Sequence, residues 1–141
     1  MKKAICFTLC LLNFFLISGC NSMNFSKKST ETETYVNDEV SLEIKNDSID
    51  NSGLVLLISN KTNTDLTYDS TYYIEQKKNG VWYSSDNEQY FNALAILLES
   101  KATNEFEVDF ETTLPQGEYR IIKSINVSTG SIPLMVDFKI S

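Results

Sequence analysis

Side chains that commonly perform catalysis are scarce in this chain of 141 residues. It contains no histidine, so it can assemble neither a Ser-His-Asp triad nor a histidine general base. Carboxylates remain, and four recur at every second position, at Glu105, Glu107, Asp109 and Glu111. A carboxylate pair could serve a glycoside hydrolase. These four alternate with phenylalanine and valine, however, which is typical of the exposed face of one strand. We therefore predict no catalytic residue, no enzyme activity and no cofactor.

All three cysteines lie within the first twenty residues. Cys6 and Cys10 belong to an apolar run at 4–17, which follows a basic start at Lys2 and Lys3. A basic start, a short apolar run and small residues before a cut site describe an export signal. The run is shorter than the ~20 residues that span a bilayer. The sequence therefore predicts a removable leader at 1–19.

The leader ends in Ile17-Ser18-Gly19-Cys20. This stretch resembles the lipobox of bacterial lipoproteins, in which an aliphatic residue and two small ones precede a modified cysteine. The resemblance implies cleavage before Cys20 and attachment of a lipid, of the palmitate type, to its sulfur. The membrane would then be a partner through Cys20, and the protein would lie on the outer face of the cell membrane. The alternative is an ordinary signal peptide with an incidental cysteine.

Charge narrows the class of partner. Loss of Lys2 and Lys3 with the leader leaves 12 − 2 = 10 basic residues against 19 acidic ones, a formal charge of −9. Such an acidic chain repels nucleic acid and anionic lipid, so neither is expected as the main partner. Acidity could equally serve only to keep a surface protein soluble.

Residues 20–37 are rich in Asn, Ser, Thr, Lys and Glu and have almost no apolar periodicity. This composition is typical of a flexible tether. At ~5–6 Å × √n, such a tether would hold the domain an r.m.s. ~20–25 Å from its anchor. We expect the folded domain to occupy 38–141.

From residue 38 onward the apolar residues alternate with polar ones, which indicates β-strands. Asn79-Gly80 separates two strand-like runs and predicts a tight hairpin with a type I′ turn. The segment 90–99 is ambiguous, and we expect a short helical turn that leads into a strand near 95–98. Seven or eight short strands predict an all-β fold, a β-sandwich.

Two stretches carry a family resemblance. Leu114, Gly117 and Tyr119 have the arrangement of a corner in which the tyrosine hydroxyl bonds back to the chain upstream. Together with the hairpin segment 72–83, they resemble bacterial immunoglobulin-like domains of small exported lipoproteins. The resemblance implies an immunoglobulin-like β-sandwich in an extracytoplasmic setting, and it implies no catalytic residue.

Aromatic residues are concentrated between 68 and 91. Candidate binding residues are Tyr72, Tyr73, Trp82, Tyr83 and Tyr90. Neighbouring strand residues point to opposite faces, so one member of each aromatic pair must face outward, where it could bind a protein or a glycan. The alternative is that these rings only stabilise the sheet. For Trp82 we expect the indole to fill the space between the sheets; the alternative is that it is exposed on the hairpin.

Other functions are open to the same sequence. An inhibitor of an envelope protease would need a rigid exposed loop, and the candidates are 84–89 and 126–131. Oxygen-rich segments at 60–65 and 86–88 could take calcium, although Asn and Asp also favour turns for backbone reasons. We predict no metal site.

Overall fold

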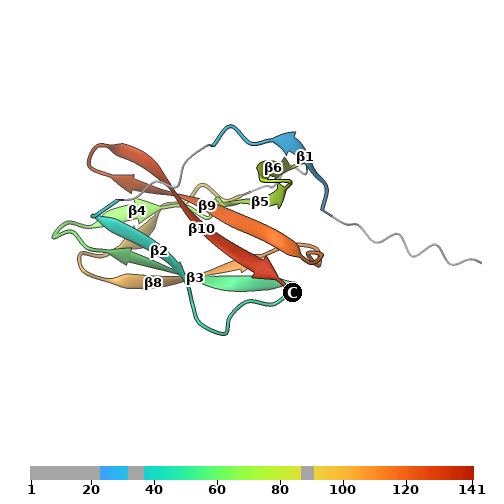
Figure 1. The fold of residues 1–141 in the computed structure, drawn as a ribbon. Helices are drawn as coiled ribbons and strands as arrows, with labels where there is room; N and C mark the ends of the chain where they lie inside the picture. The colour runs from blue at the N-terminus through green and yellow to red at the C-terminus, as the bar shows by residue number, and fades with distance from the viewer. Residues whose placement is uncertain (1–22, 32–36, 87–90) are drawn as a thin grey trace, which may run out of the picture.

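The computed structural model describes residues 23–31, 37–86 and 91–141, and all regular structure in these ranges is β (Figure 1). No helix in the described ranges has the length and apolar character needed to cross a bilayer. The ten strands are β1 (Phe25–Lys28), β2 (Val40–Ile44), β3 (Gly53–Asn60), β4 (Leu66–Tyr68), β5 (Tyr73–Lys78), β6 (Val81–Ser85), β7 (Ile96–Leu98), β8 (Thr103–Asp109), β9 (Gly117–Val127) and β10 (Gly130–Ile140).

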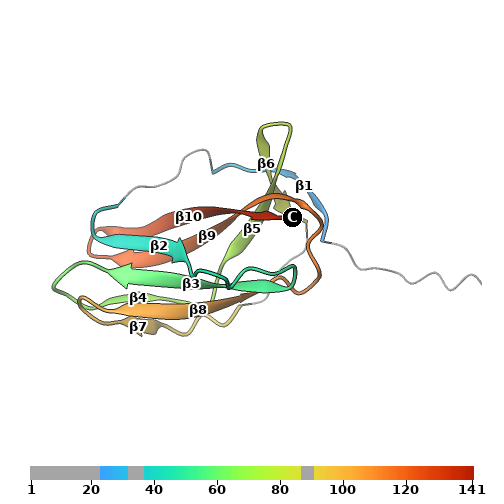
Figure 2. The same ribbon diagram turned by 60° about the horizontal axis from the view of Figure 1, so that its bottom comes forward.

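The strands form two antiparallel sheets that pack face to face (Figure 2). The larger sheet has the order β1-β6-β5-β9-β4-β7, with β10 paired to the other side of β9. The smaller sheet has the order β2-β3-β8. The prediction of an all-β, immunoglobulin-like sandwich is confirmed. The described residues contain ten strands rather than seven or eight, because β1 and β4 are too short to show an alternating pattern in sequence.

The core lies between the sheets and is built by strict alternation. In β3, Leu56 and Ile58 are fully buried, and they face the core that Ile121 and Ile125 of β9 fill from the opposite sheet. Each buried aliphatic side chain contributes about 1.5–3 kcal/mol relative to exposure. The eleven-residue register of β9 with β10 joins the last two strands along their whole length.

The first strand corrects the predicted tether. Residues 23–31 belong to the folded domain: β1 pairs with β6 at the edge of the larger sheet. Met23 and Phe25 are 4% and 3% exposed, and the Phe25 ring meets Tyr119 edge-on at 5.8 Å. Two apolar residues in a polar stretch are enough for one edge strand, although they are too few to give a periodic signal. The leader at 1–19 and Cys20 lie outside the described residues.

The hairpin at Asn79-Gly80 has the predicted geometry. Asn79 has φ 51° and Gly80 has φ 79°, as the two central positions of a type I′ turn require. This hairpin joins β5 to β6, and Figure 2 shows it standing out of the sandwich on the side away from β3 and β8. Together with β1, it forms a three-stranded ribbon that we call the β1/β5/β6 ribbon.

The helical turn expected within 90–99 is not found in the described residues 91–99. The strand predicted near 95–98 is present as β7, which pairs with β4. Leu98 is fully buried, whereas Leu94 and Leu97 are 70% and 52% exposed. Leu97 and Leu98 therefore point to opposite sides of the sheet, as successive residues of a strand do, and burial of Leu98 in the sandwich favours the extended conformation.

Candidate functional site

A buried ion pair lies on the outer face of the larger sheet, between β5 and β9. Arg120 donates from Nε to Glu75 Oε2 at 2.7 Å, and its Nη2 lies 2.6 Å from the same oxygen. Ser84 on β6 donates its hydroxyl to Glu75 Oε1 at 3.0 Å. Glu75 and Arg120 are each only 2% exposed. Because register places the pair on the face opposite the core, something other than the second sheet must cover it.

The cover comes from the segment after β1 and from Trp82. Arg120 Nη2 donates to the Glu31 carbonyl oxygen at 2.7 Å and to Ser29 Oγ at 3.3 Å. The guanidinium carbon lies 4.6 Å from the centroid of the Trp82 ring. Nε and Nη2 of Arg120 and both carboxylate oxygens of Glu75 therefore have partners, as a buried charge requires. The arrangement is structural: its acid and base are tied to each other and closed to solvent.

Trp82 does not fill the space between the sheets, so that expectation is wrong. Its register partner Lys77 places it on the outer face of the ribbon, where it is half-buried, with the Lys77 ammonium 5.4 Å from the ring centroid. Cations on an indole ring replace the apolar packing that a core position would supply. Beside the ring lies a hollow of about 380 Å³, whose other lining residues are Glu118, Tyr119, Asp137, Phe138 and Lys139.

The other predicted aromatic binding residues do not form one surface with Trp82. Tyr72 is 7% exposed; it donates its hydroxyl to the Asp109 carbonyl oxygen at 2.6 Å and packs on Phe91 at 5.0 Å. Tyr73 is 56% exposed, and its ring meets Phe91 edge-on at 6.4 Å. Tyr83 is half-buried on the opposite face of the ribbon from Trp82.

Tyr90 lies outside the described residues. Of the predicted set, Tyr73 and Trp82 therefore remain as accessible rings on the outer side of the larger sheet. Leu97 of β7, in the same sheet, is another exposed large apolar side chain of the described residues.

The corner residues hold the start of β9. The Tyr119 hydroxyl donates to the Pro115 carbonyl oxygen at 2.7 Å, which is the bond expected of a tyrosine corner, and it accepts a bond from Gln76 Nε2 at 3.1 Å. Burial raises the pKa of Tyr119 above its ordinary value. A Cβ at Gly117 would lie 3.3 Å from both the Tyr119 ring and Gln76, so a glycine fits this tight approach. Leu114 is 1% exposed and anchors the loop before the corner.

Lys123 is a buried charge that the sequence analysis did not single out. Its ammonium donates to the carbonyl oxygens of Asp69 and Thr71 and lies 5.0 Å and 4.6 Å from the ring centroids of Tyr68 and Phe106. The side chain is fully buried, and this burial lowers the pKa of Lys123 to about 8, against the opposing effect of Asp69. Lys123 lies two residues after Ile121 and two before Ile125, so the period of a strand predicts that its side chain points inward with theirs.

The described residues hold no group of three or more His, Cys, Asp or Glu side chains that could bind a metal ion. Glu105 lies on the outer face of the smaller sheet and pairs with Lys45 at 2.8 Å, and Glu107 and Asp109 are exposed on the same strand. The Asn60 side chain, in a segment considered for calcium, is turned inward and donates to the carbonyl oxygens of Thr64, Leu98 and Glu99.

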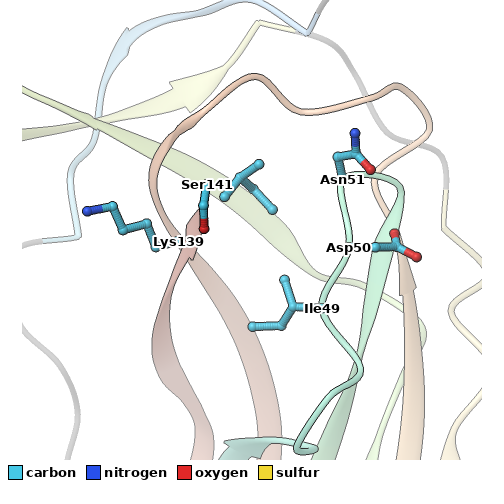
Figure 3. Close-up of a pocket in the computed structure, with 6 residues that line it drawn as sticks. Ile49, Asp50, Asn51, Lys139 and Ser141 are labelled. Carbon is cyan, nitrogen blue, oxygen red and sulfur yellow. The ribbon is translucent and has the colours of Figure 1, made fainter.

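A second hollow, of about 340 Å³, lies at the end of β10 (Figure 3). Its lining residues are Ile49, Asp50, Asn51, Lys139, Ile140 and Ser141. The Asp50 carboxylate is already engaged by the Ser52 hydroxyl and by the backbone N–H groups of Ser52 and Gly53, which lower the pKa of Asp50. These hydrogen bonds stabilise the turn before β3, so the role of Asp50 in this hollow is structural.

The loop proposed for protease inhibition at 126–131 is a hairpin turn. Val127 pairs with Gly130, so only Ser128 and Thr129 separate β9 from β10. Such a short turn does not present an extended segment to an active site. In the other candidate, 84–89, Ser84 and Ser85 belong to β6, and 87–89 lie outside the described residues.

Comparison with known proteins identifies a family, and a distant solved structure is among the structural matches. The family model for a bacterial Ig-like domain matches residues 27–139, so the match begins inside β1. No curated protein matches. Among solved structures, a protein from Archaeoglobus fulgidus is 10% identical, with 74% of this chain and 97% of that chain covered and a TM-score of 0.32.

Proposed function

Because this chain belongs to the bacterial Ig-like domain family, we propose that it is a lipoprotein that presents one non-catalytic binding module on the outer face of the cell membrane. In this proposal Cys20 carries the lipid, and the sandwich acts through its surface by contact with a protein or a glycan. No prosthetic group or reactive side chain takes part.

One observation carries the proposal: the lipobox-like Ile17-Ser18-Gly19-Cys20 stands immediately before the folded domain. Only Asn21 and Ser22 separate Cys20 from Met23, whose side chain is buried in the core. A modified cysteine at this position would lie outside the sandwich while remaining directly attached to it. Two acyl chains or more make such an anchor stable, whereas one chain gives only marginal binding.

The chemistry of the described residues supports a binding role. The buried charges Glu75 and Arg120 neutralise each other under cover, and the buried Lys123 is held by two carbonyl groups. The accessible side chains that offer a large, rigid contact area are the aromatic rings of Tyr73 and Trp82. Rigid rings on a rigid sheet suit recognition, because little side-chain freedom is lost on contact.

The test is metabolic labelling with a radioactive or alkyne-tagged palmitate in a bacterial host. The native chain should incorporate label and fractionate with membranes, and Cys20→Ala should lose both properties. Cys6→Ala and Cys10→Ala serve as matched controls and should leave labelling unchanged. Label that persists in Cys20→Ala, or an unlabelled native chain with a bare thiol at its processed terminus, would contradict the anchor.

A further inference from the structure

The position of β1 determines which edge of the domain lies nearest the proposed anchor. Cys20 precedes Met23 by three residues, which span at most about 10 Å when fully extended. Met23 is buried next to β1, and β1 lies at the edge of the larger sheet beside β6. An acyl group on Cys20 therefore holds the β1/β5/β6 ribbon, rather than a distant part of the sandwich, close to the bilayer.

The same ribbon collects basic charge in an acidic protein. Its three strands contain the four lysines Lys27, Lys28, Lys77 and Lys78, and all four are exposed. Its single acid, Glu75, is buried against Arg120. By contrast, the three strands of the smaller sheet contain four acids and no basic residue. The net charge of the whole chain therefore conceals a strong separation of charge.

Strand register places these lysines in two pairs, one on each face of the ribbon. Lys27 is opposite Ser84 and Lys77 is opposite Trp82, so these two lysines lie on one face of the ribbon. Lys28 is opposite Tyr83 and Lys78 is opposite Val81, which puts this pair on the other face. Each face therefore combines two cations with one aromatic ring, Trp82 or Tyr83.

Nearby acids only partly offset these lysines. Glu118 lies 3.8 Å from Lys77, Glu31 follows β1, and the Asp86 carboxylate accepts bonds from Asn24 and Ser26. At physiological ionic strength the Debye length is about 8 Å, so the acids on the far sheet are screened from a surface that touches the ribbon.

We propose that the β1/β5/β6 ribbon is a membrane-contact surface that binds anionic lipid headgroups and orients the domain on the bilayer. Lysines next to a membrane gain electrostatic energy from anionic lipid, and Trp and Tyr rings are favoured at the interface. Strand β8, which carries three of these four acids, then lies away from the membrane, because Figure 2 shows β3 and β8 on the side opposite the β5–β6 hairpin. The inference rests on the proposed function, since the anchor brings this edge to the bilayer.

The test separates the ribbon from the anchor by using the unacylated processed chain, 20–141 with Cys20→Ser. Sedimentation with vesicles at about 0.15 M salt should show binding to phosphatidylcholine vesicles that contain phosphatidylglycerol and not to pure phosphatidylcholine. Binding should weaken roughly fivefold for each ribbon lysine removed. Trp82, the only tryptophan, should shift its emission to shorter wavelength and be quenched by brominated lipid.

Two charge-matched variants make this decisive. Replacing Lys27, Lys28 and Lys77 by Gln should abolish binding, whereas replacing Lys45, Lys61 and Lys101 by Gln changes net charge equally and should preserve most of it. Lys78 is left in place because its ammonium donates to the Phe25 carbonyl oxygen at 2.6 Å. Equal urea midpoints for the two variants establish that both are folded.

Several outcomes would overturn the proposal: no binding to anionic vesicles, equal loss in both triple variants, an unquenched Trp82 in the bound state, or binding to soluble polyphosphate alone. If the lipid-anchor proposal is wrong, the result is different: the native chain incorporates no palmitate label, whereas the vesicle binding of the Cys20→Ser chain is unchanged.

Discussion

At the scale of single residues, the Glu75–Arg120 pair decides how the outer face of the larger sheet is closed. Both ions are 2% exposed, and their remaining hydrogen bonds go to Ser84, Ser29 and Glu31. Loss of one partner leaves the other charge buried without compensation, which costs about 3–5 kcal/mol. We expect Arg120→Met alone to lower the free energy of unfolding by about this amount in urea titration.

The double variant Glu75→Leu/Arg120→Met is the control for that prediction. It removes both charges, so its free energy of unfolding should return close to that of the native chain, because a buried ion pair often contributes little over apolar residues of similar volume. Additive losses in the double variant would mean that Ser29 and Glu31, rather than the pair itself, hold the structure.

Lys123 makes stability depend on pH. Its pKa is lowered from 10.5 to about 8 in the folded chain, so between these values the unfolded chain binds more protons. The free energy of unfolding must therefore rise with pH, by about 2 kcal/mol between about pH 7.5 and about pH 9.5. Lys123→Met should abolish this slope in urea titrations across the range. A native chain whose stability falls or stays flat over that range would contradict the buried-cation account.

Two buried tyrosines limit the pH range over which the effect of Lys123 can be measured. Burial raises the pKa of Tyr72 and Tyr119 above the ordinary 10.0, so near and above that pH the unfolded chain loses these protons first. Their effect has the opposite sign and lowers stability as pH rises. The slope from Lys123 is therefore separable only below the tyrosine range.

At the scale of elements, β1 tests whether the N-terminal segment belongs to the domain. Phe25 is 3% exposed and packs on Tyr119, so Phe25→Ala should cost about 3–5 kcal/mol of unfolding free energy. Lys27→Ala, two residues away and exposed, should change it by less than about 0.5 kcal/mol. Equal urea midpoints for the two variants would mean that residues 23–31 do not contribute to the stability of the domain.

Sequence alternation predicted the long strands because each buries one face. The alternation of Phe106 and Val108 with acidic residues in β8 is unambiguous, and Asn79-Gly80 predicted the hairpin through its need for positive φ angles. The short strands β1 and β4 gave no such signal, because three or four residues hold only one or two buried side chains. Their structure comes from pairing with strands distant in the chain, a context that local patterns do not contain.

The candidate site was harder to predict for the same reason. Aromatic richness located Tyr73 and Trp82, yet it also selected Tyr72, whose ring is in the core. Trp82 was expected between the sheets because a large apolar ring is usually buried. Its true neighbour, Arg120, lies 38 residues further along the chain and becomes adjacent only when β5 joins β6 to β9.

At the scale of the whole molecule, the fold separates charge along one direction. The β1/β5/β6 ribbon carries the lysines beside the proposed anchor, and β8 of the smaller sheet carries three acids on the opposite side (Figure 2). A tether of seventeen disordered residues would let such a domain rotate freely. Because residues 23–31 belong to the folded domain, only Asn21 and Ser22 would connect the proposed anchor to it, and the separation of charge could then orient the domain.

Lengthening this connection should therefore release the orientation without changing the fold. We expect a fifteen-residue Gly-Ser insertion between Ser22 and Met23 of the acylated chain to add an r.m.s. distance of about 20 Å. In vesicles of pure phosphatidylcholine, where the lysines gain nothing, the insertion should sharply reduce quenching of Trp82 by brominated lipid. In vesicles that contain phosphatidylglycerol, the ribbon should retain much of that contact. The urea midpoint should not move, because the insertion precedes the first buried residue. Quenching that is insensitive to the insertion in neutral vesicles would mean that the short connection does not determine the distance of the domain from the bilayer.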